Sequence, residues 1–277
     1  MVLLEFAPSP ALSEFVRVYR IVHFVFDDIT KIPFKAYPPK PEHCLSFYPR
    51  DTERVEFANS DKKVSNLNAV IIGQQTEVTN RYVGKDFLVF QVVFSPGALY
   101  RLTGIPSNEL NNGYIDAEAI FCNGIPEVNA KLNDARGYPE MVTVVECFLA
   151  AQIKRCTRDF HRMDGLSNMM LRTKENMSIE WLAGEACLSL RQYERKFIER
   201  MGASPRYFNK VIRFENAFRM KNMYPHLSWF TIAIECGYYD YQHLVKDYQA
   251  FTQKTPADFH ALDLKSPERE FGEADTY

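Results

Sequence analysis

The sequence lacks the cysteine spacing of a secreted or zinc-binding protein. Its six cysteines are Cys44, Cys122, Cys147, Cys156, Cys187 and Cys236. They lie far apart without a CxxC pair, so we expect free, buried thiols in a reducing cytoplasm. No apolar run approaches the ~20 residues that a membrane helix needs. The first residues also lack the basic and apolar segments of a signal peptide. The sequence therefore predicts a cytoplasmic protein that does not contact a membrane.

Motifs of common enzymes are missing as well. The histidines are scattered, and no HxH, HxxxH or HExxH spacing places two of them on one face for a metal. The GxSxG, P-loop and GxGxxG motifs do not occur. A cupin enzyme would need clustered His and carboxylate ligands, which are absent. A reactive thiol, as in alkyl-transfer repair proteins, has one candidate, Cys156 beside Arg155 and Arg158. We expect no enzyme, no metal and no cofactor.

The chain has no excess of positive charge. Its 277 residues carry 33 Lys and Arg against 35 Asp and Glu, a net charge of -2. A protein that grips nucleic acid over its whole surface needs many unneutralised cations, so any nucleic-acid site must be local. The hydrophobic content of 46% is sufficient for two domains with separate cores.

The sequence divides into a part with strand-like patterns and a part with helix-like patterns. From Phe15 to about Phe94, short β-branched and aromatic runs separated by turn residues predict strands. After Ser95-Pro96-Gly97, helical periodicity begins, and Met141–Arg155 forms the longest predicted helix of this half. The predicted fold class is α+β with two domains. A β-rich, cupin-like sheet or barrel with added helices covers 1–157, a linker 158–165, an all-α domain 166–264, and a polar tail 265–277.

The C-terminal third repeats itself at a period of 50 to 51 residues. The recurring pairs are Ala183 and Ala233, Ser189 and Asp240, Phe197 and Tyr248, Pro205 and Pro256, and Phe208 and Phe259. In each copy a cap is followed after eight residues by an aromatic residue, after eight more by Pro and after three more by Phe. Agreement of several spacings at once indicates two copies of one helical unit.

Each copy is predicted to be a short helix, a tight turn and a second helix. In the first copy Ser189 is placed to cap the second helix, and Gln192 completes a capping box. In the second copy Gly237 can take the positive φ that ends a helix, and Asp240 can cap the next one. The sequence therefore predicts two helix-turn-helix units.

The second helix of each unit has one apolar and one polar face. The polar faces carry Arg191, Glu194, Arg195 and Lys196 in the first unit, and Tyr241, Gln242, Val245 and Lys246 in the second. In a major groove Arg can pair with guanine, Gln can pair with adenine, and apolar groups contact the thymine methyl. We predict these eight residues as the DNA-binding residues. For any one of them, a solvated helix face is the simpler interpretation.

A connecting helix of about 17 residues is predicted to begin at Ser204-Pro205 and to stop near Tyr224-Pro225. At ~1.5 Å per residue it spans roughly 25 Å, enough to hold two reading helices about one DNA turn (~34 Å) apart. Residues 164–263 carry 13 basic and 12 acidic side chains, but the basic ones cluster. We expect one basic flank made of Arg191, Arg195, Lys196, Arg200, Arg206, Lys210, Arg213, Arg219 and Lys221, so that the first unit dominates electrostatic binding.

The last 100 or so residues resemble the DNA-binding domain of the AraC/XylS family of bacterial transcription regulators. The resemblance lies in LAGEACLS, RKF and GASPRYF of the first unit and in IAIECGYYDYQHLVKDYQAFTQKTPADF of the second. Tyr248 replaces the usual Phe, Lys254 a common Gly, and Glu194 puts a carboxylate where a base-reading polar residue is often found. More weakly, IIGQQT, VVFSPGALYRLTGIP and SNELNN resemble the sensor-like domains of such regulators. The resemblance implies a sequence-specific regulator of transcription with a regulatory first domain.

Two roles for the first domain stay open. Its aromatic residues can line a pocket for a small organic effector, although alternating strands more often bury such residues in a core. They are His23-Phe24-Val25-Phe26, Phe47, Tyr48, Phe87, Phe90 and Phe94, with Arg50, Gln74, Gln75 and Arg81 as candidate polar partners. Alternatively, the domain is a protein-interaction or assembly module without a small-molecule ligand. The partner we expect is double-stranded DNA, and RNA polymerase, an effector and a second copy of the chain are candidates.

Overall fold

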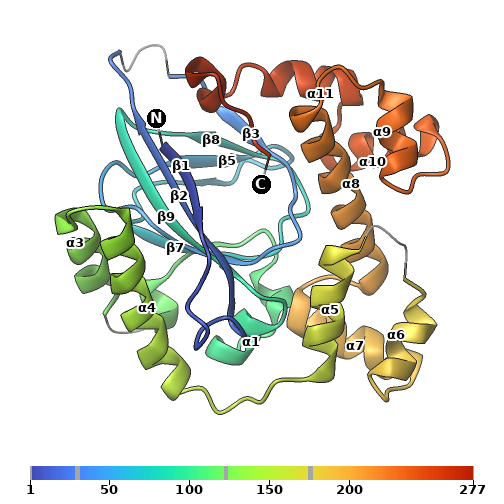
Figure 1. Ribbon diagram of the computed structural model, residues 1–277, viewed down its shortest axis with the longest axis horizontal. Coiled ribbons are helices and arrows are strands. Elements are labelled where there is room, and N and C mark those ends of the chain that lie inside the picture. The colour runs from blue at the N-terminus through green and yellow to red at the C-terminus, as the bar shows by residue number, and fades with distance from the viewer. Residues whose placement is uncertain (1, 29–31, 122–123, 174–176, 277) are drawn as a thin grey trace.

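A computed structural model describes residues 2–28, 32–121, 124–173 and 177–276. The N-terminal half contains two antiparallel sheets (Figure 1). The larger sheet has the strand order β1 (Val2–Phe6), β2 (Val16–Val25), β9 (Asp86–Phe94), β4 (Cys44–Phe47), β7 (Ala69–Ile72) and β10 (Tyr114–Asp116). The smaller has the order β3 (Lys35–Tyr37), β8 (Thr79–Tyr82), β5 (Arg54–Phe57) and β6 (Lys63–Val64). The predicted β-rich first domain is confirmed.

The central strand β9 is buried on both faces, which explains its unbroken apolar run. Leu88 and Phe90 point to the outer face of the large sheet, and Phe87 and Val89 point to the space between the sheets. Helices cover the outer face: α1 (Ala98–Thr103), η2 (Ser107–Leu110), α2 (Glu118–Phe121), α3 (Ile125–Asp134) and α4 (Tyr138–Lys154). Because successive side chains of β9 point to opposite faces of the sheet, this strand contributes residues to two separate cores.

The C-terminal half is helical, as predicted. Its elements are α5 (Arg162–Arg172), α6 (Ile179–Glu185), α7 (Leu190–Met201), α8 (Pro205–Met223), α9 (Trp229–Glu235), α10 (Tyr241–Thr252), α11 (Pro256–Asp263) and η3 (Pro267–Phe271). Helices α6 and α7 form the first helix-turn-helix unit, α9 and α10 form the second, and α8 connects them (Figure 1). None of the described helices is long and apolar enough to cross a membrane.

The residues that recur in the repeat are the cores of the two units. Phe197 and Phe208 are buried in the first, and their partners Tyr248 and Phe259 are buried in the second. The ring centroids of Phe197 and Phe208 lie 5.5 Å apart, and those of Tyr248 and Phe259 lie 6.3 Å apart. Equivalent residues of the two sequence repeats therefore pack in the same way, as the spacing of the aromatic residues predicts.

The two halves of the chain pack against each other. Helix α7 contacts η2 and α1 of the first domain, and α11 contacts β3. Helix α5 begins at Arg162, within the stretch 158–165 expected to be a linker, and Asp164 in its first turn is buried. The last described residues fold back as η3 beside β3 (Figure 1), so the described part of the predicted tail, 265–276, is in contact with the β-rich domain.

Candidate DNA-binding surface and ligand pocket

The first reading helix, α7, begins at the predicted cap. The Gln192 amide donates to Ser189 Oγ at 3.4 Å, and the Ser189 amide donates to Gln192 Oε1 at 3.1 Å, which completes the capping box. Because Tyr193 and Phe197 face the core, the opposite face is left to solvent. Arg191 and Arg195 are exposed there, and Glu194 and Lys196 are half-buried at its edges. Arg191 and Arg195 thus face solvent together, and Glu194 and Lys196 flank them on opposite sides.

The second reading helix, α10, has the same construction. Gly237 has a φ of 76° and ends α9, and the Asp240 carboxylate accepts the His243 amide at 2.7 Å. Gln242 and Lys246 are exposed, whereas Tyr241 and Val245 are half-buried. Tyr241 also packs on the core of the second unit, so only part of its ring is available to a ligand.

The two polar faces correspond at three positions, one of which pairs Glu194 with Val245. Lys196 instead corresponds to the buried Asp247, and Tyr241 corresponds to Leu190. With the 51-residue offset, Arg191 corresponds to Gln242 and Arg195 to Lys246. The connecting helix α8 has 19 residues, which at ~1.5 Å each gives about 28 Å. Two equivalent helix faces joined by a spacer near one DNA turn (~34 Å) suit two successive major-groove contacts.

The predicted basic flank is smaller than its residue count suggests. Arg200 is buried and donates two hydrogen bonds to Asp164, at 2.7 and 2.5 Å, so its assignment to the flank is wrong. Arg213 and Lys210 both pair with Asp247, at 2.9 and 3.3 Å. These pairs join α7 to α5 and α8 to α10, and the cations left for phosphate contacts lie mainly on α7 and at the start of α8.

The first domain holds the C-terminal end of α7. Ser107 Oγ donates to the Arg200 carbonyl at 2.8 Å, and Asn111 Nδ2 donates to the Gly202 carbonyl at 2.6 Å. A Cβ on Gly202, whose φ is 80°, would lie 2.6 Å from Asn111 Oδ1. Tyr100 OH also donates to Glu199 Oε1 at 3.0 Å. Elements η2 and α1 therefore contact the C-terminal end of α7 directly.

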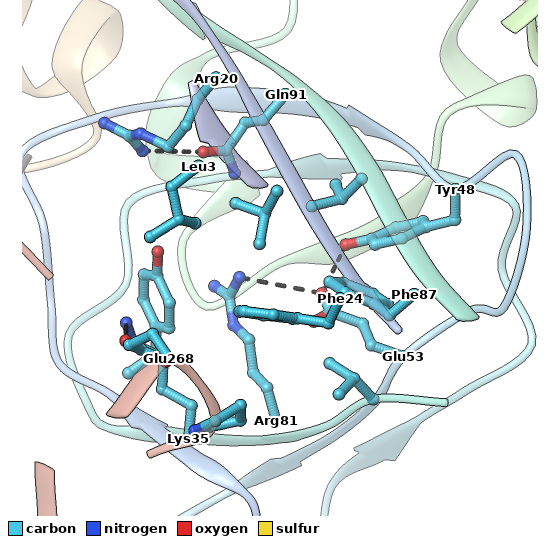
Figure 2. A pocket seen from close by; sticks show the side chains of 15 residues that line it. Leu3, Arg20, Phe24, Lys35, Tyr48, Glu53, Arg81, Phe87, Gln91 and Glu268 are labelled. Atoms are coloured by element: carbon cyan, nitrogen blue, oxygen red, sulfur yellow. Dashed lines mark hydrogen bonds and ion pairs between the residues drawn. The ribbon is translucent and has the colours of Figure 1, made fainter. Parts of the chain in front are cut away.

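A cavity opens between the two sheets of the first domain (Figure 2). It encloses about 600 Å³, its opening to solvent included. Its apolar walls are Leu3, Val22, Phe24, Val83, Phe87 and Val89, and its polar lining is Arg20, Lys35, Tyr37, Tyr48, Glu53, Arg81, Gln91 and Glu268. Pro267 and Glu268 come from η3, so the C-terminal end of the chain forms part of the wall. Apolar walls with a few convergent polar groups are typical of small-molecule sites.

Charges in the cavity form three groups, one of which is Lys35 with Glu268 of η3. Arg20 Nη1 donates to Gln91 Oε1 at 2.8 Å and pairs with Glu42 at 3.2 Å. Burial opposes ionisation of Glu42, but Arg20 and Arg17 lower its pKa to about 2. In the second group Arg81 lies 3.8 Å from the Glu53 carboxylate.

The Glu53 carboxyl lies deep beside the apolar wall. Tyr48 OH donates to Glu53 Oε1 at 2.5 Å, and Figure 2 shows both side chains near Phe87. Burial raises the pKa of Glu53 above its ordinary value, although Arg81 and Tyr48 act in the opposite direction. A carboxyl of this kind is a candidate to discriminate between ligands by charge.

Only some of the expected pocket residues line the cavity. Phe24, Tyr48, Phe87 and Arg81 do. Phe47, Phe90 and Phe94 belong to the core under the helices instead. Arg50 is exposed and pairs with Asp86 at 2.8 Å, and Gln74 and Gln75 donate to backbone carbonyls.

Sequence reasoning missed Arg20, Lys35, Glu53 and Gln91. A signal for two of them existed, since Arg20 and Gln91 are isolated polar residues within apolar strands. They are also paired in the register of β2 and β9. An isolated polar residue on an inward strand position indicates a site or a buried ion pair.

The remaining chemical candidates are weak. Cys156 is half-buried, and its thiol donates to the carbonyls of Arg101 and Arg158 at 3.1 and 3.5 Å. Within the described part of the chain, no three His, Cys, Asp or Glu side chains come together to hold a metal ion.

Comparisons with known proteins match both halves. Residues 182–261 match a family model described as a helix-turn-helix domain, and residues 4–116 match one described as a domain of unknown function. No curated protein matches the sequence. The chain is similar to the crystal structure of ToxT from Vibrio cholerae, with 12% identity, a TM-score of 0.47, and 90% of this chain and 98% of that one covered.

Two further solved structures match the helical half. The DNA-binding domain of AdpA, crystallised with a target DNA, is 22% identical over 38% of this chain and 95% of that one, with a TM-score of 0.35. A transcriptional regulator with an AraC-type DNA-binding domain from Chromobacterium violaceum is 24% identical over 36% of this chain and 87% of that one, with a TM-score of 0.31.

Proposed function

We propose that this protein, a DNA-binding transcription regulator with an AraC/XylS-type helix-turn-helix domain, reads specific sequences with α7 and α10 and answers to a small molecule bound by its first domain. The observation that carries the proposal is the pair of equivalent, capped helices with polar outer faces. Capping fixes where each reading helix begins, and the core of each unit fixes which face of that helix turns to solvent. The proposed role needs no chemical step and no cofactor.

The proposed reading residues are the eight predicted from the repeat. In α7 Arg191 and Arg195 are exposed and can form paired hydrogen bonds with guanine. In α10 Gln242 is exposed and suits adenine, while the half-buried Val245 can contact a thymine methyl. We expect the first unit to supply more of the affinity, since it carries more exposed cations, and the second to add sequence discrimination.

The proposed effector site is the cavity between the sheets. Two features support it: apolar walls on both sheets, and buried ionic groups whose positions are fixed by partners. We also propose the division into a regulatory domain at 1–157 and a DNA-binding domain at 166–264. RNA polymerase and a second copy of the chain stay proposed partners, and the cytoplasm is the compartment in which we expect the protein to act.

Selection from a random duplex pool tests the DNA-reading part. Purified full-length protein should enrich one sequence family containing two short boxes about one helical turn apart. If the affinity for DNA falls with salt but no sequence is enriched, the protein binds DNA non-specifically and the DNA-reading part of the proposal is wrong.

A thermal-shift screen of metabolites tests the effector part. A ligand at 100 times its dissociation constant adds about 2.7 kcal/mol of stability. The matched control is Val89→Trp, which places a larger side chain in the cavity wall and should abolish the shift. If no compound shifts the wild-type protein, the alternative of an assembly module without a small-molecule ligand is favoured.

A further inference from the structure

The turn before the second reading helix is one residue longer than the turn of the first unit. The Leu188 amide donates to the Ala183 carbonyl at 3.0 Å, and the Tyr238 amide donates to the Ala233 carbonyl at 2.9 Å, so the two turns are equivalent up to this point. The next residue caps the first reading helix, whereas in the second unit Tyr239 stands before the cap. Because the first unit forms the same turn without it, Tyr239 is not needed for the fold of the unit.

The side chain of Tyr239 has no packing role. It is 90% exposed, and the next most exposed large apolar side chain of the described residues, Phe230, is 62% exposed. Within the described part of the chain, the Tyr239 hydroxyl has no hydrogen-bond partner. Figure 1 shows α9 and α10 apart from the sheets of the first domain, with α8 between them. The ring and its hydroxyl are therefore available to a partner.

The residues on both sides of Tyr239 are fixed. Tyr238 is 3% exposed, and the Arg213 guanidinium lies over its ring, 4.3 Å from the centroid. On the other side, the Asp240 carboxylate accepts the His243 amide at 2.7 Å and begins α10. The backbone of Tyr239 is thus held in place, so a contact made by its side chain costs little ordering of the turn.

The second unit has few cations with which to hold DNA. Helix α10 carries one lysine, Lys246, and no arginine, whereas α7 carries three arginines and one lysine. Beside α10, Lys210 and Arg213 both pair with Asp247. Contacts of this unit with the DNA backbone must therefore come largely from neutral donors.

The position of Tyr239 suits a contact with the DNA backbone. In a helix-turn-helix unit the second helix enters the major groove, and the first helix crosses the sugar-phosphate backbone. The turn between them therefore lies near the phosphates that border the groove. The tyrosine hydroxyl is a hydrogen-bond donor, and tyrosine is among the residues that bind phosphate oxygens in protein–DNA complexes.

We propose that the Tyr239 hydroxyl donates a hydrogen bond to a phosphate at the edge of the DNA box that α10 reads. Such a contact positions α10 along the duplex and carries no base preference of its own. It adds affinity to the unit that is poorer in cations. This inference rests on the proposed reading of DNA by α10, and the experiment below separates the two.

The experiment compares Tyr239→Phe with Tyr82→Phe in the full-length protein. Both substitutions remove one hydroxyl, but Tyr82 lies on β8 of the first domain. The probe is the duplex obtained by sequence selection, and fluorescence anisotropy measures the affinity. Tyr239→Phe should bind about tenfold more weakly than wild type, because a hydrogen bond to a charged group is lost. The loss should be equal for the selected site and for its single-base variants, whereas Tyr82→Phe should match wild type.

Substitution of single phosphates locates the contact. A methylphosphonate removes the charge of one phosphate, and it is placed in turn at each position of the two boxes. For the wild type, one replacement at the edge of a box should weaken binding about tenfold, and for Tyr239→Phe the same replacement should cost less than about twofold, because the hydroxyl that used this phosphate is absent. Replacements elsewhere should cost both proteins the same.

Equal affinity of Tyr239→Phe and wild type for the selected duplex would overturn the inference and leave sequence reading by α10 intact. A loss confined to particular bases, or a loss without a phosphate at which the two proteins differ, would overturn it as well. If selection enriches no sequence, the proposed reading is wrong. In that case Tyr239→Phe should still bind a mixed-sequence duplex about tenfold more weakly, because a phosphate contact does not depend on sequence, and equal affinity there would overturn the inference too.

Discussion

Neutralising Asp164 should destabilise the packing of α5 against α7 far more than neutralising a surface carboxylate would. Asp164 has a side chain only 2% exposed, and it accepts two hydrogen bonds from Arg200 and one, at 3.1 Å, from the His161 amide. Asp164→Asn keeps the size of the side chain but removes its charge. The Arg200 guanidinium, only 9% exposed, is then left without its counterion.

The expected loss follows from the burial of both partners. Breaking a buried pair costs about 3–5 kcal/mol. Asparagine can still accept from the His161 amide and from one nitrogen of Arg200, so we expect about 3 kcal/mol, the lower end. The matched control is Glu185→Gln, which breaks the exposed pair with Arg162, whose side chains are 39% and 60% exposed. Such a surface pair should contribute below about 1 kcal/mol.

Urea unfolding at pH 7 measures the difference. The chain has two tryptophans, one in each helical unit, so a Trp229→Phe background leaves Trp181 as the fluorescent reporter of the first unit. Circular dichroism gives the whole-chain transition beside it. If Asp164→Asn and Glu185→Gln cost the same free energy, the buried Asp164–Arg200 pair does not stabilise the packing of α5 against α7 more than a surface pair does.

Two further predictions concern stability at other places in this architecture. Burial lowers the pKa of His43 to about 4, so the unfolded chain, with a histidine pKa near 6.5, binds the proton first as the pH falls. Stability from this residue is therefore lost between pH 6.5 and about 4. His43→Gln should reduce the decrease in unfolding free energy from pH 7 to pH 4.5 by about 2 kcal/mol, and parallel pH profiles of variant and wild type would contradict this. Gly202→Ala and Gly124→Ala both place a side chain at positive φ, but the Gly202 Cβ would clash with Asn111 Oδ1 at 2.6 Å, whereas the Gly124 Cβ would lie at an ordinary 3.7 Å from Phe148. Thermal unfolding should show a loss at least about 1 kcal/mol larger for Gly202→Ala, and equal losses would mean that this contact is not tight.

The helical units could be predicted because their determinants are local. Ser189 caps a helix that starts one residue later, and Gly237 and Asp240 end one helix and begin the next within a few residues. The 51-residue repeat then gave an independent check, since Phe197 and Tyr248 had to play the same packing role. Helix caps and repeat spacings of this kind can be recognised in a single sequence.

The cavity could not be predicted because its residues meet only through long-range pairing. Arg20 and Gln91 are 71 positions apart and meet through the register of β2 and β9. Lys35 and Glu268 are 233 positions apart, and no pattern in the sequence links them. Similarly, Arg200 was expected at the surface, because its buried partner Asp164 lies on another helix. Pairings that depend on how domains dock are set by the whole fold.

Base preference at the selected DNA site tests the central claim most directly. Arg195→Ala and Gln242→Ala are each titrated against the wild-type site and against all single-base changes in its two boxes, with Arg155→Ala as a surface control. We predict that each reading-helix variant loses about 1–3 kcal/mol at bases within one box only, a different box for each variant, and that Arg155→Ala changes nothing. If a variant loses the same DNA-binding free energy at every base of the site, or if both variants keep the base preference of the wild type, recognition by two separate helices is contradicted.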